Sequence, residues 1–209
     1  YGYAEYIQKA LISDEERYEC TQFIMSECSR LQNMAYQLLD MALLRRGEME
    51  EEDCSVATLF EQSQKAMYVK AAEKKIHLSY AQSQGFFIRG NMEQLLIMLN
   101  NLIDNAMKAS QPKGRICVSS YGEESRVVVE VEDHGIGMDS DQISHIKEAF
   151  YRVDKARSRA AGGAGLGLSI CERIAQLHHA ELTFVSERGK GTIVRLYFPK
   201  IKEESFTSS

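Results

Sequence analysis

The segment VVVEVEDHGIGM, residues 127–138, carries the signal that decides the fold of this chain. A run of β-branched residues is typical of a buried strand, and this run ends in Asp133, Gly135 and Gly137. Glycine permits positive φ and a close approach of a ligand, and an ionised aspartate accepts hydrogen bonds from an amino group such as that of adenine. The same pattern also suits an ordinary turn, so its interpretation depends on the rest of the chain.

On both sides of this segment the sequence predicts alternating helices and strands. The expected order is a helix at 55–73, strands at 76–80 and 86–89, a helix at 91–110, strands at 115–121 and 126–132, a short helix at 140–148, a helix at 165–178, and a closing hairpin of strands at 181–187 and 191–198. Mixed elements with hairpin connections predict an α+β fold, an α/β sandwich in which helices cover one face of a mixed sheet.

Residues 1–48 predict a partial helical hairpin that precedes this domain. Ser13 and Glu16 form a capping box that begins a long helix at 14–46. Its apolar positions alternate steps of four and three, which is typical of a helix packed lengthwise on another helix: Ile24, Cys28, Leu31, Ala35, Leu38 and Ala42. We therefore expect a helical unit at 1–48, a domain at 52–200 and a disordered tail at 201–209.

The helix at 91–110 carries a second group of candidate site residues. Asn101, Asn105 and Lys108 fall at i, i+4 and i+7 on one face. The expected core stripe lies on another face: Leu95, Leu99, Leu102, Ala106 and Ala109. An amide oxygen suits Mg²⁺ and a lysine can neutralise phosphates, although three polar residues alone more often form a solvated face.

A third motif, GGAGLGLS at 162–169, has glycines running into a helix, which is the sequence form of a phosphate cradle. It is neither a dinucleotide fingerprint nor a P-loop, and in isolation it also fits a flexible hinge. Before it lies FYRVDKARSR at 150–159, with four cations against one acid, which would make a mobile lid over phosphates. A last glycine motif, GKGT at 189–192, is a hairpin turn by itself.

The order of these motifs resembles the N, G1, F, G2 and G3 boxes of the histidine-kinase ATPase domain in the GHKL superfamily. The matching segments are 101–108, 133–137, 150–152, 163–167 and 189–192. Residues 2–7 resemble the segment that follows the phosphoacceptor in the dimerisation and phosphotransfer hairpin. The resemblance implies the catalytic part of a two-component sensor histidine kinase that uses ATP and Mg²⁺.

Carried over by position, the resemblance implies that Asn105 binds Mg²⁺ and that Asn105, Lys108 and Arg152 are the catalytic residues. Asn101 and Lys108 would support the phosphates, Arg152 would approach the γ-phosphate, and Asp133 would read the adenine amino group. The remaining expected nucleotide-binding residues are Gly135, Gly137, Phe150, Gly163, Gly165, Leu166, Gly167 and Thr192.

Two residues depart from the family pattern. Ala109 stands where the family commonly has an aromatic residue, and His134 stands where asparagine is common. The first departure bears on lid packing and the second on contacts at the base end. Neither removes a charged group that the chemistry requires.

The acceptor of the phosphoryl group is expected to lie outside this sequence. Hydrolytic relatives such as gyrase have a glutamate where this chain has Asn101, and an amide cannot act as a general base, which favours phosphoryl donation. None of the five histidines lies in the family's H-[DE]-x-[KR]-x-P context, so we expect the acceptor a few residues before Tyr1. This chain alone should bind ATP without forming stable phosphohistidine.

Composition limits the partners. The net charge of −5 supplies no basic field for nucleic acid, and the five cysteines show no metal-ligand spacing. No run approaches the ~18 apolar residues of a membrane span, so we expect the cytoplasmic portion of a sensor whose anchor lies upstream. The expected partners are a second copy in the intact parent protein and the receiver domain of a response regulator.

Three alternative functions stay open. A nucleotide-binding scaffold without transfer activity would keep the same motifs, and sequence does not exclude it. A serine kinase of the anti-sigma type shares the nucleotide boxes, but the N-terminal hairpin counts against it. A hydrolase of the gyrase type is disfavoured by Asn101.

Overall fold

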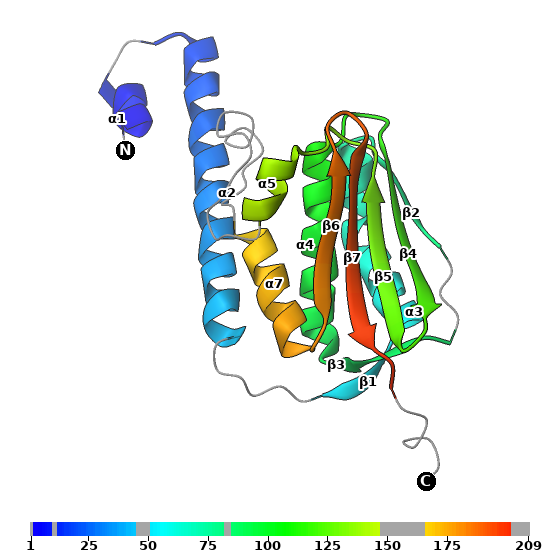
Figure 1. Cartoon of the computed structure of the whole chain (residues 1–209). Helices are drawn as coiled ribbons and strands as arrows, with labels where there is room; N and C mark the ends of the chain where they lie inside the picture. Colours follow the sequence, from blue (N-terminus) through cyan, green and yellow to red (C-terminus); the bar gives the residue numbers. More distant parts are fainter. Residues whose placement is uncertain (1, 10–11, 45–50, 82–84, 147–165, 202–209) are drawn as a thin grey trace.

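The structure of the chain is a computed structural model (Figure 1). It describes residues 2–9, 12–44, 51–81, 85–146 and 166–201. None of the helices in these segments combines the length and the apolar composition needed to cross a membrane.

A five-stranded mixed sheet forms the centre of the fold, in the order β2-β4-β5-β7-β6. Its strands are β2 (His77–Tyr80), β4 (Arg115–Glu123), β5 (Arg126–Asp133), β6 (Glu181–Glu187) and β7 (Gly191–Pro199). β2 runs parallel to β4, and the other neighbouring pairs are antiparallel. The apolar strand that ends at Asp133 is therefore the middle strand, hydrogen-bonded on both sides, which explains its β-branched composition.

Helices cover one face of this sheet (Figure 1): α3 (Val56–Glu73), α4 (Met92–Ala109) and α7 (Gly167–Leu177). α4 begins where the side chain of Asn91 accepts the backbone N–H of Gln94. Its buried face carries the predicted core residues Leu95, Leu99, Leu102 and Ala106, with Met98, Ile103 and Met107 beside them. The predicted α+β sandwich is thus confirmed. Ala109 is only half-buried, because it ends the helix.

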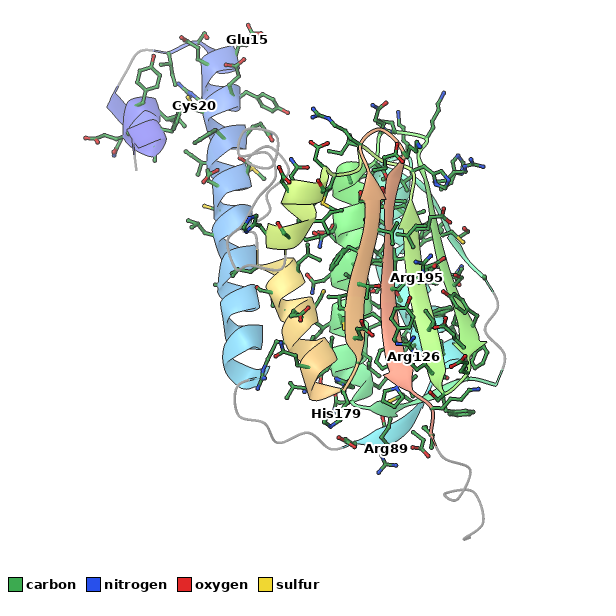
Figure 2. The ribbon with its side chains drawn as sticks, viewed as in Figure 1. Glu15, Cys20, Arg89, Arg126, His179 and Arg195 are labelled. Carbon is green, nitrogen blue, oxygen red and sulfur yellow. The ribbon has the colours of Figure 1, made fainter. Side chains whose placement is uncertain are left out.

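The other face of the sheet is covered by its own long side chains. Arg195 on β7 donates to Glu130 on β5 at 2.6 Å, and the guanidinium of Arg126 lies 4.3 Å from the ring centroid of Tyr197. Figure 2 shows both arginines over the strands. Val128, whose cross-strand neighbours include Tyr197, is 0% exposed. The ion pair and the aromatic rings therefore shield a face on which no described helix lies.

A separate two-stranded sheet pairs β1 (Glu52–Ser55) with β3 (Phe87–Gly90). The sequence predicted β3 but not β1, because its two acidic residues are unfavourable in strands. Pairing overrides that preference: Cys54 becomes buried, and Arg89 on β3 donates to Asp53 at 2.9 Å. Residues 52–54, for which the sequence predicted no element, thus belong to a strand.

Helices α1 (Gly2–Lys9) and α2 (Asp14–Leu44) form the N-terminal segment, and α2 lies alongside α7 (Figure 1). The predicted capping box begins α2: Ser13 Oγ accepts the N–H of Glu16 at 3.2 Å, and Glu16 accepts the N–H of Ser13 at 2.9 Å. α1 packs on α2 through the rings of Tyr3 and Phe23, whose centroids are 4.4 Å apart.

Part of the predicted seam on α2 faces solvent. Cys28, Leu31 and Ala35 are exposed, and Ile24 is half-buried. An exposed apolar stripe on a helix is typical of a surface that packs on another helix. The division into units at 1–48, 52–200 and 201–209 remains a prediction. The predicted helix at 140–148 begins as α5 (Ser140–His145), and 202–209 lie outside the described residues.

Candidate nucleotide-binding site

The middle strand β5 ends in a buried carboxylate, that of Asp133. Asp133 is 6% exposed, and its Oδ1 accepts the backbone N–H of Gly135 at 2.8 Å. Burial raises the pKa of Asp133, and backbone hydrogen bonds from Gly135 and Thr192 oppose this shift only in part. Thr192 on β7 pairs with Asp133 on β5, so these two predicted nucleotide-binding residues are neighbours. A carboxylate in this position can accept a hydrogen bond from an amino group.

Gly135 lets the turn after β5 pack against the end of α4. A Cβ at Gly135 would lie 2.5 Å from the carbonyl oxygen of Ala109 and 2.8 Å from Oδ1 of Asp133, closer than a side chain tolerates. The N–H of Ile136 donates to the same Ala109 carbonyl at 3.1 Å. The helix that carries the asparagines and the turn that carries Asp133 are thereby joined.

Gly137 and Ser186 join this turn to the hairpin of β6 and β7. Gly137 has φ +62°, and a Cβ there would overlap the carbonyl of Glu187. The hydroxyl of Ser186 accepts the N–H of Met138 at 2.9 Å and lies 2.9 Å from the hydroxyl of Thr192. Ser186 was not predicted as a site residue, because a serine within a strand has no sequence signal that separates it from a surface position.

Asn101 and Asn105 lie half-exposed on α4 and face the start of α7. Nδ2 of Asn101 donates to the carbonyl of Ile97 at 2.9 Å. A Cβ at Gly167 would lie 3.0 Å from Oδ1 of Asn101 and 3.8 Å from Nδ2 of Asn105, so glycine leaves room that a side chain would fill. Because α7 begins at Gly167, its first N–H groups and the positive end of its dipole lie beside the two amides, which is a favourable place for phosphate.

Lys108, one turn beyond Asn105, is held by a carboxylate on its own helix. Its Nζ contacts Oδ2 of Asp104 at 2.6 Å, and Nζ of Lys70 on α3 contacts Oδ1 of the same residue at 2.5 Å. Burial opposes ionisation of Asp104, but the two lysines outweigh it and lower the pKa of this carboxyl. A group of cations therefore lies at the end of α4 that also contacts the Asp133 turn.

Four predicted site residues lie outside the described residues: Phe150, Arg152, Gly163 and Gly165. Leu166 and Gly167 are the described part of that glycine motif. The side chain of Leu166 is 1% exposed, and its carbonyl accepts the N–H of Ile170 at 3.0 Å. The Leu166 side chain thus anchors the beginning of α7 in the core.

The paired histidines lie at the other end of α7. His178 is buried: its Nδ1 lies 2.8 Å from the carbonyl oxygen of Ile174, and its Nε2 accepts the N–H of Asn91 at 3.0 Å. Burial lowers the pKa of His178. His178 is the C-cap residue of α7, and the neighbouring His179 is exposed (Figure 2).

A hollow of about 360 Å³ lies at this end of the sheet, away from Asp133. It is lined by Glu51, Arg89, His178, His179, Phe198, Pro199, Lys200 and Ile201. Phe198 pairs with Val127 at the opposite end of β5 from Asp133, so the hollow and the predicted nucleotide-binding residues are separate. Among the described residues, no group of three or more His, Cys, Asp and Glu side chains is placed to hold a metal.

Comparison with known proteins agrees with this arrangement. Residues 90–202 match the model of the family described as "Histidine kinase-, DNA gyrase B-, and HSP90-like ATPase". That segment contains α4, the Asp133 turn, the start of α7 and the closing hairpin.

Individual relatives include two curated sensor histidine kinases. Sensor histidine kinase RppB of Synechocystis sp. is 36% identical over 168 residues, which are 78% of this chain and 37% of RppB. Sensor histidine kinase YkoH of Bacillus subtilis is 33% identical over 181 residues, 86% of this chain and 39% of YkoH. The chain thus spans less than two fifths of the length of these relatives.

A solved structure resembles nearly the whole chain. Histidine kinase ThkA, in a complex with response regulator protein TrrA, has a TM-score of 0.76 and 21% identity, over 97% of this chain and 57% of the ThkA chain. At that identity the likeness concerns the fold. From the family match, the chain belongs to the histidine kinase-, DNA gyrase B- and HSP90-like ATPase family, and RppB and YkoH, to which it is similar, are sensor histidine kinases.

Proposed function

We propose that this chain is the ATP-binding catalytic part of a two-component sensor histidine kinase. In this proposal it transfers the γ-phosphoryl group of ATP to a histidine that this sequence does not contain. The main support is the convergence of three motifs that are distant in sequence. Asn101 and Asn105 lie against Gly167, and the end of their helix is hydrogen-bonded to the turn that follows Asp133.

Each described residue has a chemical role in this proposal. The carboxylate of Asp133 accepts a hydrogen bond from the adenine amino group, with Thr192 beside it. Gly135 and Gly137 let the adenine base approach the backbone. Asn101, Lys108 and the first N–H groups of α7 from Gly167 hold the phosphates. These roles fit the geometry, because the turn after the buried Asp133 is bonded to the end of α4 and Gly167 lies against Asn101 and Asn105 on the same helix.

Asn105 is the proposed ligand of Mg²⁺. Its amide oxygen is a hard ligand, and Mg²⁺ usually takes only one or two protein ligands with phosphate oxygens and water. The ion, when bound, neutralises the charge that develops on the transferred phosphate. Arg152 is proposed to approach the γ-phosphate, and Phe150, Gly163, Gly165 and the backbone of Leu166 to complete the phosphate side.

Transfer rather than rapid hydrolysis follows from Asn101. Its amide cannot take a proton from water, so the site lacks the general base of hydrolytic relatives, and catalysis rests on positioning and electrostatics. A neutral imidazole nitrogen would attack the γ-phosphorus while the bond to ADP breaks. The exposed Cys28, Leu31 and Ala35 on α2 support pairing with a second copy in the parent protein.

The downstream partner is proposed to be the receiver domain of a response regulator. ThkA was solved in a complex with a response regulator protein, and RppB and YkoH are named as sensor histidine kinases. By the same likeness, this chain is proposed to be the cytoplasmic portion of a membrane-anchored sensor. A direct test supplies the chain with a dimerisation hairpin that contains the acceptor histidine, and follows the phosphoryl group through an acid-labile phosphohistidine on that hairpin to a purified receiver domain.

The first experiment tests the nucleotide site. ATP is titrated into the chain with and without Mg²⁺ by calorimetry, for wild type, Asn105→Ala and Gln176→Ala. Gln176, an exposed amide near the far end of α7, is the matched control. We expect wild type and the control to bind more tightly with Mg²⁺, and Asn105→Ala to lose this difference.

Two outcomes would contradict the proposal. A folded wild-type chain that binds no ATP would remove the nucleotide site. Tight ATP binding without phosphorylation of a supplied dimerisation hairpin that contains the acceptor histidine would instead favour a nucleotide-binding scaffold. Phosphate that survives acid treatment would indicate a serine acceptor.

A further inference from the structure

Asp104 is a carboxylate shared by lysines from two helices. Lys108, on the same helix, contacts Oδ2 at 2.6 Å, and Lys70 on α3 contacts Oδ1 at 2.5 Å. The Asp104 side chain is 17% exposed, against 28% for Lys108 and 46% for Lys70. Oδ1 is fully buried and makes no aligned hydrogen bond in the described part of the chain, so the ammonium of Lys70 is the contact that balances its charge.

This arrangement matters for Lys108, because one ammonium group has two competing anionic partners. A phosphate oxygen can bind Lys108 fully only if the lysine gives up part of its contact with Asp104. Removing the cation from a partly buried carboxylate is costly unless another cation stays in place. Lys70 is the cation that stays, since it holds the other carboxylate oxygen.

A third lysine adds positive charge around the same carboxylate. Lys74 is the residue that follows α3. Burial lowers its pKa, Asp104 raises it, and the nearby Lys70 and Lys108 lower it further. Among these four side chains, the three lysines outnumber the one carboxylate. Such a site favours an incoming phosphate once the lysines are free to turn.

We propose that Lys70 is a positioning residue for nucleotide binding. It stays paired with the carboxylate of Asp104 when Lys108 turns away from that carboxylate to the phosphates of ATP. Lys70 itself does not touch the nucleotide in this proposal. The inference rests on the proposed nucleotide site and names a residue on α3, a helix that contains none of the recognised motifs.

A double-mutant cycle separates this role from direct phosphate binding. The variants are Lys70→Met, Asp104→Asn and the double variant, each titrated with ATP in the presence of Mg²⁺ and with adenosine. Lys65→Met is the matched control, because Lys65 also lies on α3 and pairs with a carboxylate, that of Glu61 at 2.6 Å. Thermal unfolding of each variant checks that the fold is kept.

Lys70→Met is expected to weaken ATP binding about tenfold, which lies within the range of coupling energies between charged neighbours. Its affinity for adenosine should stay within about twofold of wild type. Without Lys70, Lys108 is the remaining close cation for Asp104 and is held more firmly. Asp104→Asn frees Lys108, so ATP should bind as well as in wild type or more tightly. In that background Lys70→Met should weaken ATP binding far less than it does alone, and Lys70→Arg alone should keep the affinity of wild type.

The other outcomes contradict specific parts of the reasoning. If Lys70→Met weakens ATP binding equally with and without Asp104, Lys70 contacts the phosphates directly. An equal loss of affinity for ATP and for adenosine would indicate a merely structural role. Unchanged affinity for ATP would remove any role of Lys70 in binding. Each of these overturns the inference while wild type still binds ATP. A wild type that binds no ATP would overturn the proposed function itself.

Discussion

Asp133→Asn separates the function of the buried carboxylate from its place in the fold. Oδ1 accepts the N–H of Gly135 at 2.8 Å, and an asparagine amide oxygen can accept that bond equally well. The change therefore keeps the acceptor for Gly135 and replaces the second carboxylate oxygen with an NH₂ donor, which also weakens the interaction with the N–H of Thr192. Facing the adenine amino group, a donor meets a donor, and the negative charge is gone.

The expected effect on affinity follows from the charge on the acceptor. A hydrogen bond to a charged group contributes roughly 1.5–3 kcal/mol, so ATP should bind about 10- to 150-fold more weakly to Asp133→Asn. Glu132→Gln is the matched control. Glu132 is the adjacent residue on β5, and the same chemical change is made there on a side chain that is 40% exposed. Its ATP affinity should equal that of wild type.

Stability should change in the opposite direction. Burial raises the pKa of Asp133 above the ordinary 3.8, so the ionised form destabilises the folded state above the raised pKa. Below the ordinary value both folded and unfolded states carry the proton, and this penalty disappears. The free energy of unfolding of Asp133→Asn should therefore exceed that of wild type most at neutral pH, and the difference should shrink on acidification.

Calorimetric ATP titration and urea unfolding at several pH values measure both effects on the same samples. The reasoning is wrong about the base contact if Asp133→Asn binds ATP as well as Glu132→Gln does. It is wrong about burial if the stability difference between Asp133→Asn and wild type does not depend on pH. A variant that is both weaker in binding and less stable at neutral pH would indicate that the turn had collapsed.

Two further predictions concern the backbone and the buried histidine. Gly137→Ala should lower the free energy of unfolding by roughly 1–3 kcal/mol, because φ is +62° and the new Cβ overlaps the carbonyl of Glu187. Gly189→Ala, with φ +80° but open space around it, should cost only about 1 kcal/mol in urea unfolding, and equal losses would mean that the overlap is relieved. His178 has a folded-state pKa below the ordinary 6.5, so the folded state binds fewer protons, and stability should fall as pH drops below that value. Urea unfolding of His178→Gln, which keeps an acceptor for the N–H of Asn91, should lack this fall, and a wild type without it would contradict the assignment.

Most of the fold could be predicted because its elements carry periodic patterns. The apolar stripe on α4 and the β-branched run of β5 are local signals, and their caps and glycines lie within a few residues. β1 could not be predicted, because Glu52 and Asp53 form a strand only through pairing with β3, whose residues lie more than thirty positions later. Strand formation there depends on a partner and not on composition.

The candidate site residues that the sequence predicts are those that lie within local motifs. Asn105 and Asp133 lie within short motifs whose chemistry is legible from residue type and spacing. Ser186, Lys70 and Asp104 make contacts between elements that are far apart in the sequence, and no spacing rule relates them. Side-chain convergence of this kind is a property of packing, so it becomes visible only in three dimensions.

α7 connects the candidate nucleotide site with the N-terminal helix. Its first residue, Gly167, faces Asn101 and Asn105. α7 also packs against α2 (Figure 1), on which Cys28, Leu31 and Ala35 are exposed. Free-energy coupling between two binding sites is reciprocal. By whatever factor a nucleotide at Gly167 changes the affinity of α2 for its partner, that partner changes nucleotide affinity by the same factor. Nucleotide titrations with and without a bound helix therefore measure the communication in both directions.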